Sequence, residues 1–359
     1  MQQSFKNRVS AFWNNFSEKE SEIRKMMDAK TEGEKLIAFV DEILQTAFHK
    51  VYFEMGINEE GKYELILTPE GDRTKLIQIH YWLQYAPEHL TDKWNFYSTK
   101  PGKGDAGFNL EMFGISLESK DIQVYPEPDE ERKKIDIQIY SPKLMKLDEN
   151  QRYSMFFIEL DQFISEIYTM EYIGFVDFVE EEPEDEQHVP LEKMKSYIDY
   201  VINENDWSTP GNPCEEYSAY NMKPVQTENW ELRKDIVAGY TSCIPFLNAY
   251  YSGENELFDS FAEDGVIFGF IYYENSNVPR ENTVAFRTNI EEKISDKSID
   301  AGIAHPIGGA TGYKYSYIDF VVFDFESFLA IAREALSGND FAEAGFAFFK
   351  AGEDSVSLI

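Results

Sequence analysis

Hydrophobic residues in the first 50 positions recur at helical spacing. From Phe5 onward they occupy positions i, i+4, i+7, i+8 and i+11, which form one face of a helix: Phe5, Val9, Phe12, Trp13 and Phe16. Thr31 and Glu34 match a capping box, a signal for the start of a second helix. The chain is therefore expected to open with two amphipathic helices.

After residue 50 the hydrophobic period changes to two. Residues 51–57 and 62–68 alternate on either side of the turn-forming segment 58–61, which is typical of a β-hairpin. A helix is expected over 74–85, ending before Pro87. Strands are expected at 94–99, 108–113, 122–125, 135–140 and 172–179. The apolar stretch 153–172 predicts a mixture of strand and helix.

A change in composition follows residue 176. The segment 177–186 holds seven acids and no base, and after a predicted helix at 191–202 comes the turn-rich segment 205–213. We place a domain boundary there, which gives an N-terminal domain over 1–205 and a C-terminal domain over 206–359.

The C-terminal half repeats the mixture of elements. Helices are expected at 242–251, 254–263, 288–297 and 326–336, and strands at 266–273, 301–307, 313–323 and 345–349. Short connections between helices and hairpins favour an α+β fold of two domains, each an antiparallel sheet with helices packed on one face.

Charge narrows the class of protein. The chain has 66 Asp and Glu against 33 Lys and Arg, a formal charge of −33, and residues 206–359 hold 25 of those acids and 10 of those bases. An acid excess in both halves disfavours binding to nucleic acid or to anionic membrane surfaces. The 43% hydrophobic content excludes a disordered acidic tail.

Apolar runs and cysteines indicate where the protein is located and whether it binds a metal. The first residues lack the apolar run of a signal peptide, and the longest apolar runs are strand-sized, as at 266–273. Cys214 and Cys243 form no CxxC pair, so we expect free thiols in a cytoplasmic protein. No motif predicts a metal or a cofactor.

The sharpest local motif is the glycine-rich segment Gly308-Gly309-Ala310-Thr311-Gly312. A glycine-rich turn holds phosphate when its amides converge at a helix N-terminus, but here a strand follows and there is no GK[ST] sequence. Glycines that supply positive φ in a tight hairpin or a bulge are the favoured interpretation.

Asp319 is the acid of most individual interest. On a regular strand it shares a face with Tyr315, Tyr317 and other apolar residues, so a buried carboxylate there needs a partner. Tyrosine hydroxyls or Arg287 are the partners that we consider. A structural ion pair is favoured, and the alternative is a pocket in which Arg287 and Asp319 recognise a polar ligand between tyrosine walls.

His305 is the histidine nearest to these candidates, just before Pro306 and the glycine segment. A general-base role for it is a minor alternative to a structural one. Close carboxylate pairs arise by chance among 66 acids, and no nucleophile, nucleotide or calcium motif is present. No residue pattern therefore names a reaction, and whether the chain is an enzyme stays open.

Two stretches resemble bacterial families of unknown function. Phe12-Trp13-Asn14-Asn15-Phe16 resembles the opening helix of one such group, over roughly residues 5–200. Gly265-Val266-Ile267-Phe268-Gly269-Phe270, Phe286-Arg287, Gly308 to Gly312 and Tyr317-Ile318-Asp319-Phe320 resemble a domain family associated with the regulator of ribonuclease activity B group, over roughly 228–350. The second resemblance implies a ferredoxin-like C-terminal domain that acts by binding a protein.

These observations lead to two hypotheses about function. The first is a non-catalytic inhibitor, immunity or regulatory protein that docks on a basic protein through an acidic surface with aromatic anchors. The second is a small-molecule-binding protein or enzyme with a pocket near Arg287 and Asp319. Its candidate residues are Arg287, His305, Gly308, Gly309, Thr311, Gly312, Tyr317 and Asp319.

Overall fold

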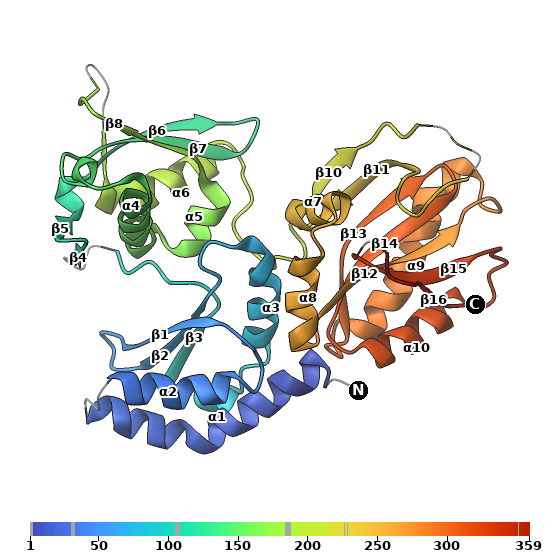
Figure 1. Cartoon of the computed structure of the whole chain (residues 1–359), viewed down its shortest axis with the longest axis horizontal. Helices are drawn as coiled ribbons and strands as arrows, with labels where there is room; N and C mark the ends of the chain where they lie inside the picture. Colours follow the sequence, from blue (N-terminus) through green and yellow to red (C-terminus); the bar gives the residue numbers. More distant parts are fainter. Residues whose placement is uncertain are drawn as a thin grey trace. The chain divides into compact units, whose positions relative to one another are not determined.

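The structure is a computed structural model that describes residues 3–29, 33–104, 108–183, 188–225, 227, 229–350 and 352–359. Its helices and several sheets confirm the α+β class (Figure 1). Thr31 of the expected capping box and Glu184, Asp185 and Glu186 of the acidic run lie outside the described residues.

The chain forms two compact units that do not follow the order of the sequence. One unit comprises residues 1–51, 80–92 and 212–359, and the other comprises 52–79 and 93–211. The expected boundary at 205/206 lies close to the break at 211/212. However, the N-terminal helices belong with the C-terminal residues, so the expected contiguous domains 1–205 and 206–359 differ from the observed units.

The first unit contains both N-terminal helices and a seven-stranded sheet. Its helices are α1 (Phe5–Asp28), α2 (Gly33–Leu44), α7 (Ile244–Ser252), α8 (Asn255–Asp264), α9 (Thr283–Ser298) and α10 (Phe325–Leu336). Its strands are β10 (Ser218–Asn221), β11 (Ile236–Thr241), β12 (Ile267–Glu274), β13 (Ala304–Gly312), β14 (Tyr315–Val322), β15 (Ala344–Phe348) and β16 (Val356–Ser357). The strand order is β10-β11-β13-β14-β12-β15-β16, and every pair is antiparallel.

The core of this sheet is ferredoxin-like. The chain order β12-α9-β13-β14-α10-β15 is a βαββαβ unit, and its strands lie in the order β13-β14-β12-β15. Helices α9 and α10 share a core with alternate residues of β14, namely Ile318, Phe320 and Val322. The expected ferredoxin-like C-terminal fold is therefore present, extended by β10, β11 and β16.

Helices cover both faces of this sheet, whereas we expected helices on one face only. On the face opposite α9 and α10, Phe246 of α7 and Phe261 of α8 pack against Phe268 of β12, with ring centroids 4.2 and 5.0 Å away (Figure 1). Successive side chains of a strand point to opposite faces. The central strands β12 and β14 therefore contribute side chains to two separate interiors.

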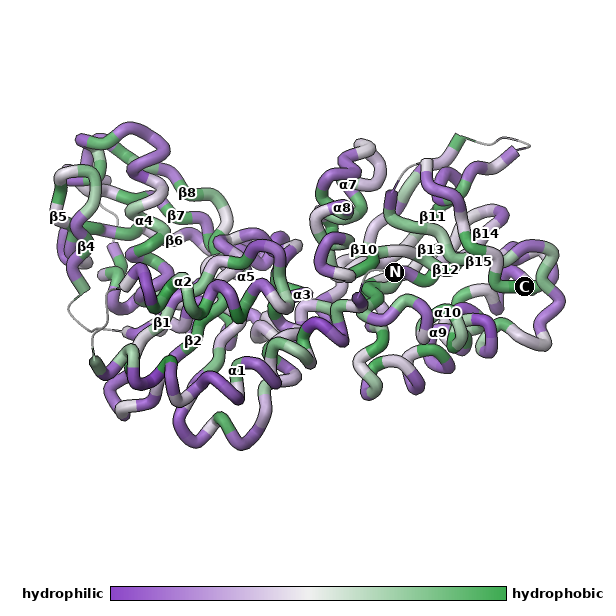
Figure 2. Tube along the Cα trace, turned by 60° about the horizontal axis from the view of Figure 1, so that its bottom comes forward, coloured by the Kyte–Doolittle hydropathy of each residue, from purple (hydrophilic) through white to green (hydrophobic). Residues whose placement is uncertain are grey.

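Local sequence accounts for the ends and faces of the helices. Ser4 caps α1 by accepting a hydrogen bond from the Asn7 amide, and the expected apolar face of α1 is buried. Helix α8 ends at Gly265, whose φ of +86° is a conformation that favours glycine. Along α1 and α10 the hydropathy alternates with the helical turns (Figure 2).

The second unit holds three smaller sheets and the helices that pack on them. Its helices are α4 (Glu149–Ile164), α5 (Glu166–Tyr172) and α6 (Met194–Glu204), and α3 (Arg73–Gln84) is divided between the units. Its strands are β1 (Tyr52–Ile57), β2 (Tyr63–Thr68), β3 (Trp94–Tyr97), β4 (Asn109–Met112), β5 (Ile115–Glu118), β6 (Gln123–Asp129), β7 (Lys134–Tyr140), β8 (Ile173–Val179) and β9 (Val189–Pro190). Short 3-10 helices lie at Ser119–Asp121, Leu144–Lys146 and Leu191–Lys193 in this unit, and at Glu88–Leu90 and Arg280–Asn282 in the first.

Two expectations for this unit are wrong in detail. The pairs β2–β3 and β7–β8 are parallel, so the expected purely antiparallel sheets are mixed. The stretch 153–172 contains no strand but the two helices α4 and α5, which join at Ser165. The apolar run of α4 is buried on one side in the core of this unit, so what resembled a strand is the buried stripe of a helix.

Candidate functional site

The glycine segment of the predicted site is a strand, not a turn. Gly308, Gly309, Thr311 and Gly312 all lie in β13, which has an irregular register between Pro306 and Gly308. Gly308 pairs with Asp319 and Gly309 pairs with Ile318. Because paired residues share a face, the two glycines lie on opposite faces of the sheet. The segment therefore does not form a glycine-rich turn whose amides could bind phosphate.

Asp319 is paired with Arg233, not with Arg287. The Arg233 guanidinium donates from Nη1 to Asp319 Oδ1 at 2.6 Å and from Nη2 to Oδ2 at 3.3 Å. Both side chains are buried, with exposed fractions of 0% and 1%. The expected structural ion pair exists, but its partner comes from the segment before β11, 86 residues away in the sequence.

Aromatic rings enclose this ion pair. The Arg233 guanidinium lies 4.9 Å from the ring centroids of Phe270 and Phe349, and 5.5 Å from that of Tyr317. Burial acts to lower the pKa of Arg233, but the Asp319 carboxylate outweighs it and raises that pKa. Arg233 is thus a permanent cation that is paired with Asp319 in a closed interior, although its Nε has no hydrogen-bond partner.

Tyr317 and Asp235 complete this interior. Tyr317 donates to Asp235 Oδ1 at 2.5 Å and accepts a hydrogen bond from the Arg233 amide at 2.8 Å. Asp235 Oδ2 accepts from the amides of Lys314, in the turn between β13 and β14, and of Tyr315, the first residue of β14. Burial and the Asp235 carboxylate raise the pKa of Tyr317. Through these hydrogen bonds, Tyr317 and Asp319 join β14 to the segment that precedes β11.

Arg287 lies on the other face of the sheet, on helix α9. Its Nη1 donates to Thr311 Oγ1 at 3.0 Å, and its guanidinium lies 5.2 Å from the centroid of Tyr240. A Cβ on Gly309 would lie 3.4 Å from Arg287 Nε, so the missing side chain leaves room for the guanidinium. Arg287 and Asp319 thus belong to separate faces, and the expected pocket containing both is wrong.

A cleft of about 550 Å³ opens beside Arg287. It lies between β11, α9 and the end of β13, and Thr311 and Gly312 line it together with Tyr240, Arg280 and Thr283. Three of the predicted residues, Arg287, Thr311 and Gly312, therefore do share a cavity. Gly309 adjoins Arg287 and shapes its surroundings.

His305 is separate from both groups. Its Nδ1 lies 2.8 Å from the Pro306 carbonyl oxygen, and its Nε2 lies 3.4 Å from Glu215 Oε1. Burial, with His305 as a nearby charge, lowers the pKa of His80. His305 is not placed among the residues that line the Arg287 cleft. The general-base role has no support from this arrangement.

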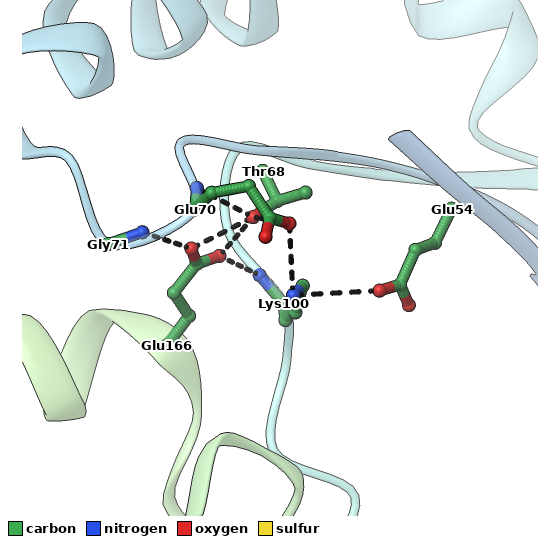
Figure 3. Close-up of polar contacts among 6 residues, drawn as sticks. All are labelled: Glu54, Thr68, Glu70, Gly71, Lys100 and Glu166. Atoms are coloured by element: carbon green, nitrogen blue, oxygen red, sulfur yellow. Dashed lines mark hydrogen bonds and ion pairs between the residues drawn. The ribbon is translucent and has the colours of Figure 1, made fainter. Parts of the chain in front are cut away.

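In the second unit, Glu166 joins three segments of the chain (Figure 3). Its carboxylate accepts hydrogen bonds from the Thr68 hydroxyl at 2.8 Å and from the amides of Gly71 and Lys100 at 3.0 and 2.9 Å. Lys100 Nζ lies 3.1 Å from Glu70 Oε1. Every group in this cluster has a partner within it, so we interpret it as a structural clamp that sequence analysis missed.

Asp161 lies beside the clamp, in a cleft of about 670 Å³. It accepts a hydrogen bond from the Thr169 hydroxyl at 2.5 Å. Burial, with Glu166 nearby, raises the pKa of Asp161 to about 7. The hydroxyls of Ser154 and Thr169 in the same cleft donate to the Asn150 carbonyl oxygen and to Asp161, so neither is arranged as a nucleophile activated by a base.

The outer face of the sheet β8-β7-β6-β9 carries several acids around one aromatic side chain. We call it the acidic sheet face and define it by Glu127, Asp136, Gln138, Phe175 and Asp177, which line a shallow groove of about 560 Å³. The inner face of the same strands is apolar and packs on α4 and α6. Phe175 is 72% exposed, although aromatic side chains of this size are usually buried.

Comparison with protein-family models, with curated proteins and with solved structures found no match to the chain. Over the described residues, no helix is long and apolar enough to span a membrane, and no group of three or more His, Cys, Asp or Glu side chains is arranged to hold a metal ion. Cys214 and Cys243 are both buried and are not joined by a disulfide.

Proposed function

We propose that this chain acts by binding a basic polypeptide on the acidic sheet face. The observation that carries the proposal is an uncovered sheet face on which Glu127, Asp136 and Asp177 surround the exposed ring of Phe175. An exposed aromatic residue beside carboxylates is the composition expected of an anchor for a cationic partner. The charge of −33 adds long-range attraction to such a partner.

Contacts on this face indicate how a cationic side chain is recognised. The Arg132 guanidinium lies 4.7 Å from the Phe175 ring centroid and also contacts Asp136. The face therefore already holds one arginine between an aromatic ring and a carboxylate. A partner's arginine or lysine beside Glu127 and Asp177 would find the same two kinds of group.

The resemblance to the ribonuclease-regulator group, which implies protein binding, points in the same direction. No step of catalysis is part of the proposal. A nucleic acid is a poor candidate for the partner because its phosphates would be repelled by the acid excess.

The test is recovery of bound proteins from a lysate on the immobilised chain, followed by identification at low and high salt. We expect a basic protein at low salt that is lost steeply as salt rises, because screening weakens exposed charge pairs. The variant Glu127→Gln/Phe175→Ala/Asp177→Asn should lose that protein. The matched control Glu256→Gln/Glu292→Gln removes two exposed acids in the other unit and should retain it.

Two outcomes contradict the proposal. Recovery of no protein at any ionic strength is the first. Recovery of the same protein by the wild type and by the face variant is the second, because the partner would then dock elsewhere.

A further inference from the structure

The Arg287 cleft contains a buried cation with no acid bonded to it, in contrast to Arg233, the other buried arginine of the described residues. Arg287 is 5% exposed, and no carboxylate of the described residues lies within ion-pair distance of its guanidinium. Its Nε has no hydrogen-bond acceptor, but neither has the Nε of Arg233, so the missing carboxylate is what distinguishes Arg287. In a chain with twice as many acids as bases, a buried arginine left in this state is unusual.

Glu291 is an acid on the same helix that interacts with Arg287. It lies one helical turn further along α9, and its Oε2 accepts a hydrogen bond from the Tyr240 hydroxyl at 2.7 Å. Burial raises the pKa of Glu291, which opposes its ionisation, although Arg287 acts in the other direction. Glu291 is therefore held by Tyr240 and gives Arg287 only partial compensation.

Other groups add positive potential to the same cleft. Arg280 lines it and is exposed. The first turn of α9 begins at Thr283, contains no acid and also lines the cleft, so the positive end of the helix dipole contributes there. Glu281, in the 3-10 turn just before α9, is not among the residues that line the cleft. Thr311 accepts a hydrogen bond from Arg287, which leaves its hydroxyl proton free to donate.

We propose that this cleft binds a small organic anion whose phosphate or carboxylate group is held by Arg287, Arg280 and the Thr311 hydroxyl. Guanidinium groups bind both kinds of oxyanion through paired hydrogen bonds. The volume of about 550 Å³ exceeds what an inorganic ion fills and suits a metabolite-sized ligand. Val278, Val284 and Tyr313 supply the apolar wall for its body. This site is independent of the acidic sheet face, which lies in the other unit.

The test is isothermal titration with two probes, phenyl phosphate and benzoate, against the neutral benzyl alcohol. We expect binding of at least one anionic probe and none of the alcohol. The stronger probe identifies whether phosphate or carboxylate is the recognised group. Arg287→Met should weaken binding of that probe at least tenfold, and Arg280→Gln should weaken it severalfold.

Lys293→Gln is the matched control. It removes one positive charge from the exposed side of the same helix, outside the cleft lining, and should leave binding unchanged. Equal weakening by Lys293→Gln would overturn the proposal, since general charge would then explain the result. Absence of binding by both anions at 10 mM overturns it too. If Arg287→Met does not fold, an unchanged affinity in Arg280→Gln overturns it and a severalfold loss supports it.

Discussion

Arg233 and Arg287 lie on opposite faces of one sheet and are both buried, yet their surroundings differ. Arg233 meets Asp319 through two hydrogen bonds and is enclosed by aromatic rings. Arg287 meets a threonine hydroxyl and one tyrosine ring beside an open cleft. The comparison teaches that burial alone does not separate a structural arginine from one that binds a ligand. Two further features distinguish them: Arg233 has a carboxylate partner, and Arg287 lines a cavity.

The largest expected effect follows loss of Arg233. Arg233→Met leaves Asp319 buried without a cation and should cost about 3–5 kcal/mol of the free energy of unfolding. Arg287→Met should cost less than about 1 kcal/mol, because no buried carboxylate loses an ion-pair partner when Arg287 is removed. Urea unfolding, with hydrogen exchange of β12–β14 as the local measurement, compares the two.

The double variant Arg233→Met/Asp319→Leu is the control for this comparison. Removing both charges should recover most of the loss, since no unpaired ion remains. Equal losses for Arg233→Met and Arg287→Met would show that both arginines are structural, and would remove the contrast.

The two neighbouring glycines test the same contrast at the backbone. A Cβ on Gly308 would lie 2.5 Å from the Tyr240 carbonyl oxygen, so Gly308→Ala should cost about 1–3 kcal/mol. A Cβ on Gly309 would lie 3.0 Å from the Tyr317 carbonyl oxygen, and Gly309→Ala should cost less. Thermal unfolding measures both. A larger loss for Gly309→Ala would mean that the Arg287 face is the more tightly packed one.

Thr311→Val should have a smaller effect. It removes the acceptor of the Arg287 Nη1 hydrogen bond while nearly preserving side-chain shape, with an expected cost of about 1 kcal/mol in the free energy of unfolding. Chemical denaturation provides the measurement. A cost of several kcal/mol would indicate that Arg287 depends on Thr311 as Arg233 depends on Asp319.

The smallest expected effect is the pH dependence contributed by Glu291. Burial raises its pKa in the folded state above the unfolded value, so the folded chain holds the proton more tightly. The contribution of Glu291 to stability is thus present at low pH and is lost as pH rises through the folded pKa. Glu291→Gln should remove this slope. Thermal midpoints at pH 4 to 8, compared with the wild type, should differ by roughly a few degrees at most.

Periodicity predicted the helices well, because a buried helical stripe is a local property of the sequence. Both N-terminal helices, the first hairpin, and the helices at 326–336 and 191–202 lie within a few residues of the expected ranges. The segment 153–172 was predicted incorrectly because a short apolar run does not separate a strand from the buried side of a helix. Helix α9 begins at Thr283, ahead of the expected start, which places Arg287 inside it.

The candidate site was predicted in part. Alternation along β14 correctly placed Asp319 with Tyr317 on one buried face, and burial required a cation for it. Nothing local identified Arg233, because its partner lies 86 residues away and the segment before β11 carries no periodic signal. Gly308, Gly309 and Gly312 were expected to supply positive φ in a tight hairpin or a bulge; the strand is irregular between Pro306 and Gly308, but none of the three has positive φ. Glycine also permits close strand packing, and that is its role at Gly308 and Gly309.

The sequence by itself determined the α+β class, the acid excess in both halves and the need of Asp319 for a counter-charge, because periodicity and composition are local quantities. Only the tertiary structure decided which arginine meets Asp319, that Arg287 instead faces a cleft, and that residues 1–51 group with residues 212–359. The physical reason is that strand pairing brings together residues far apart in the chain, and the pleat sends neighbours such as Gly308 and Gly309 to opposite faces.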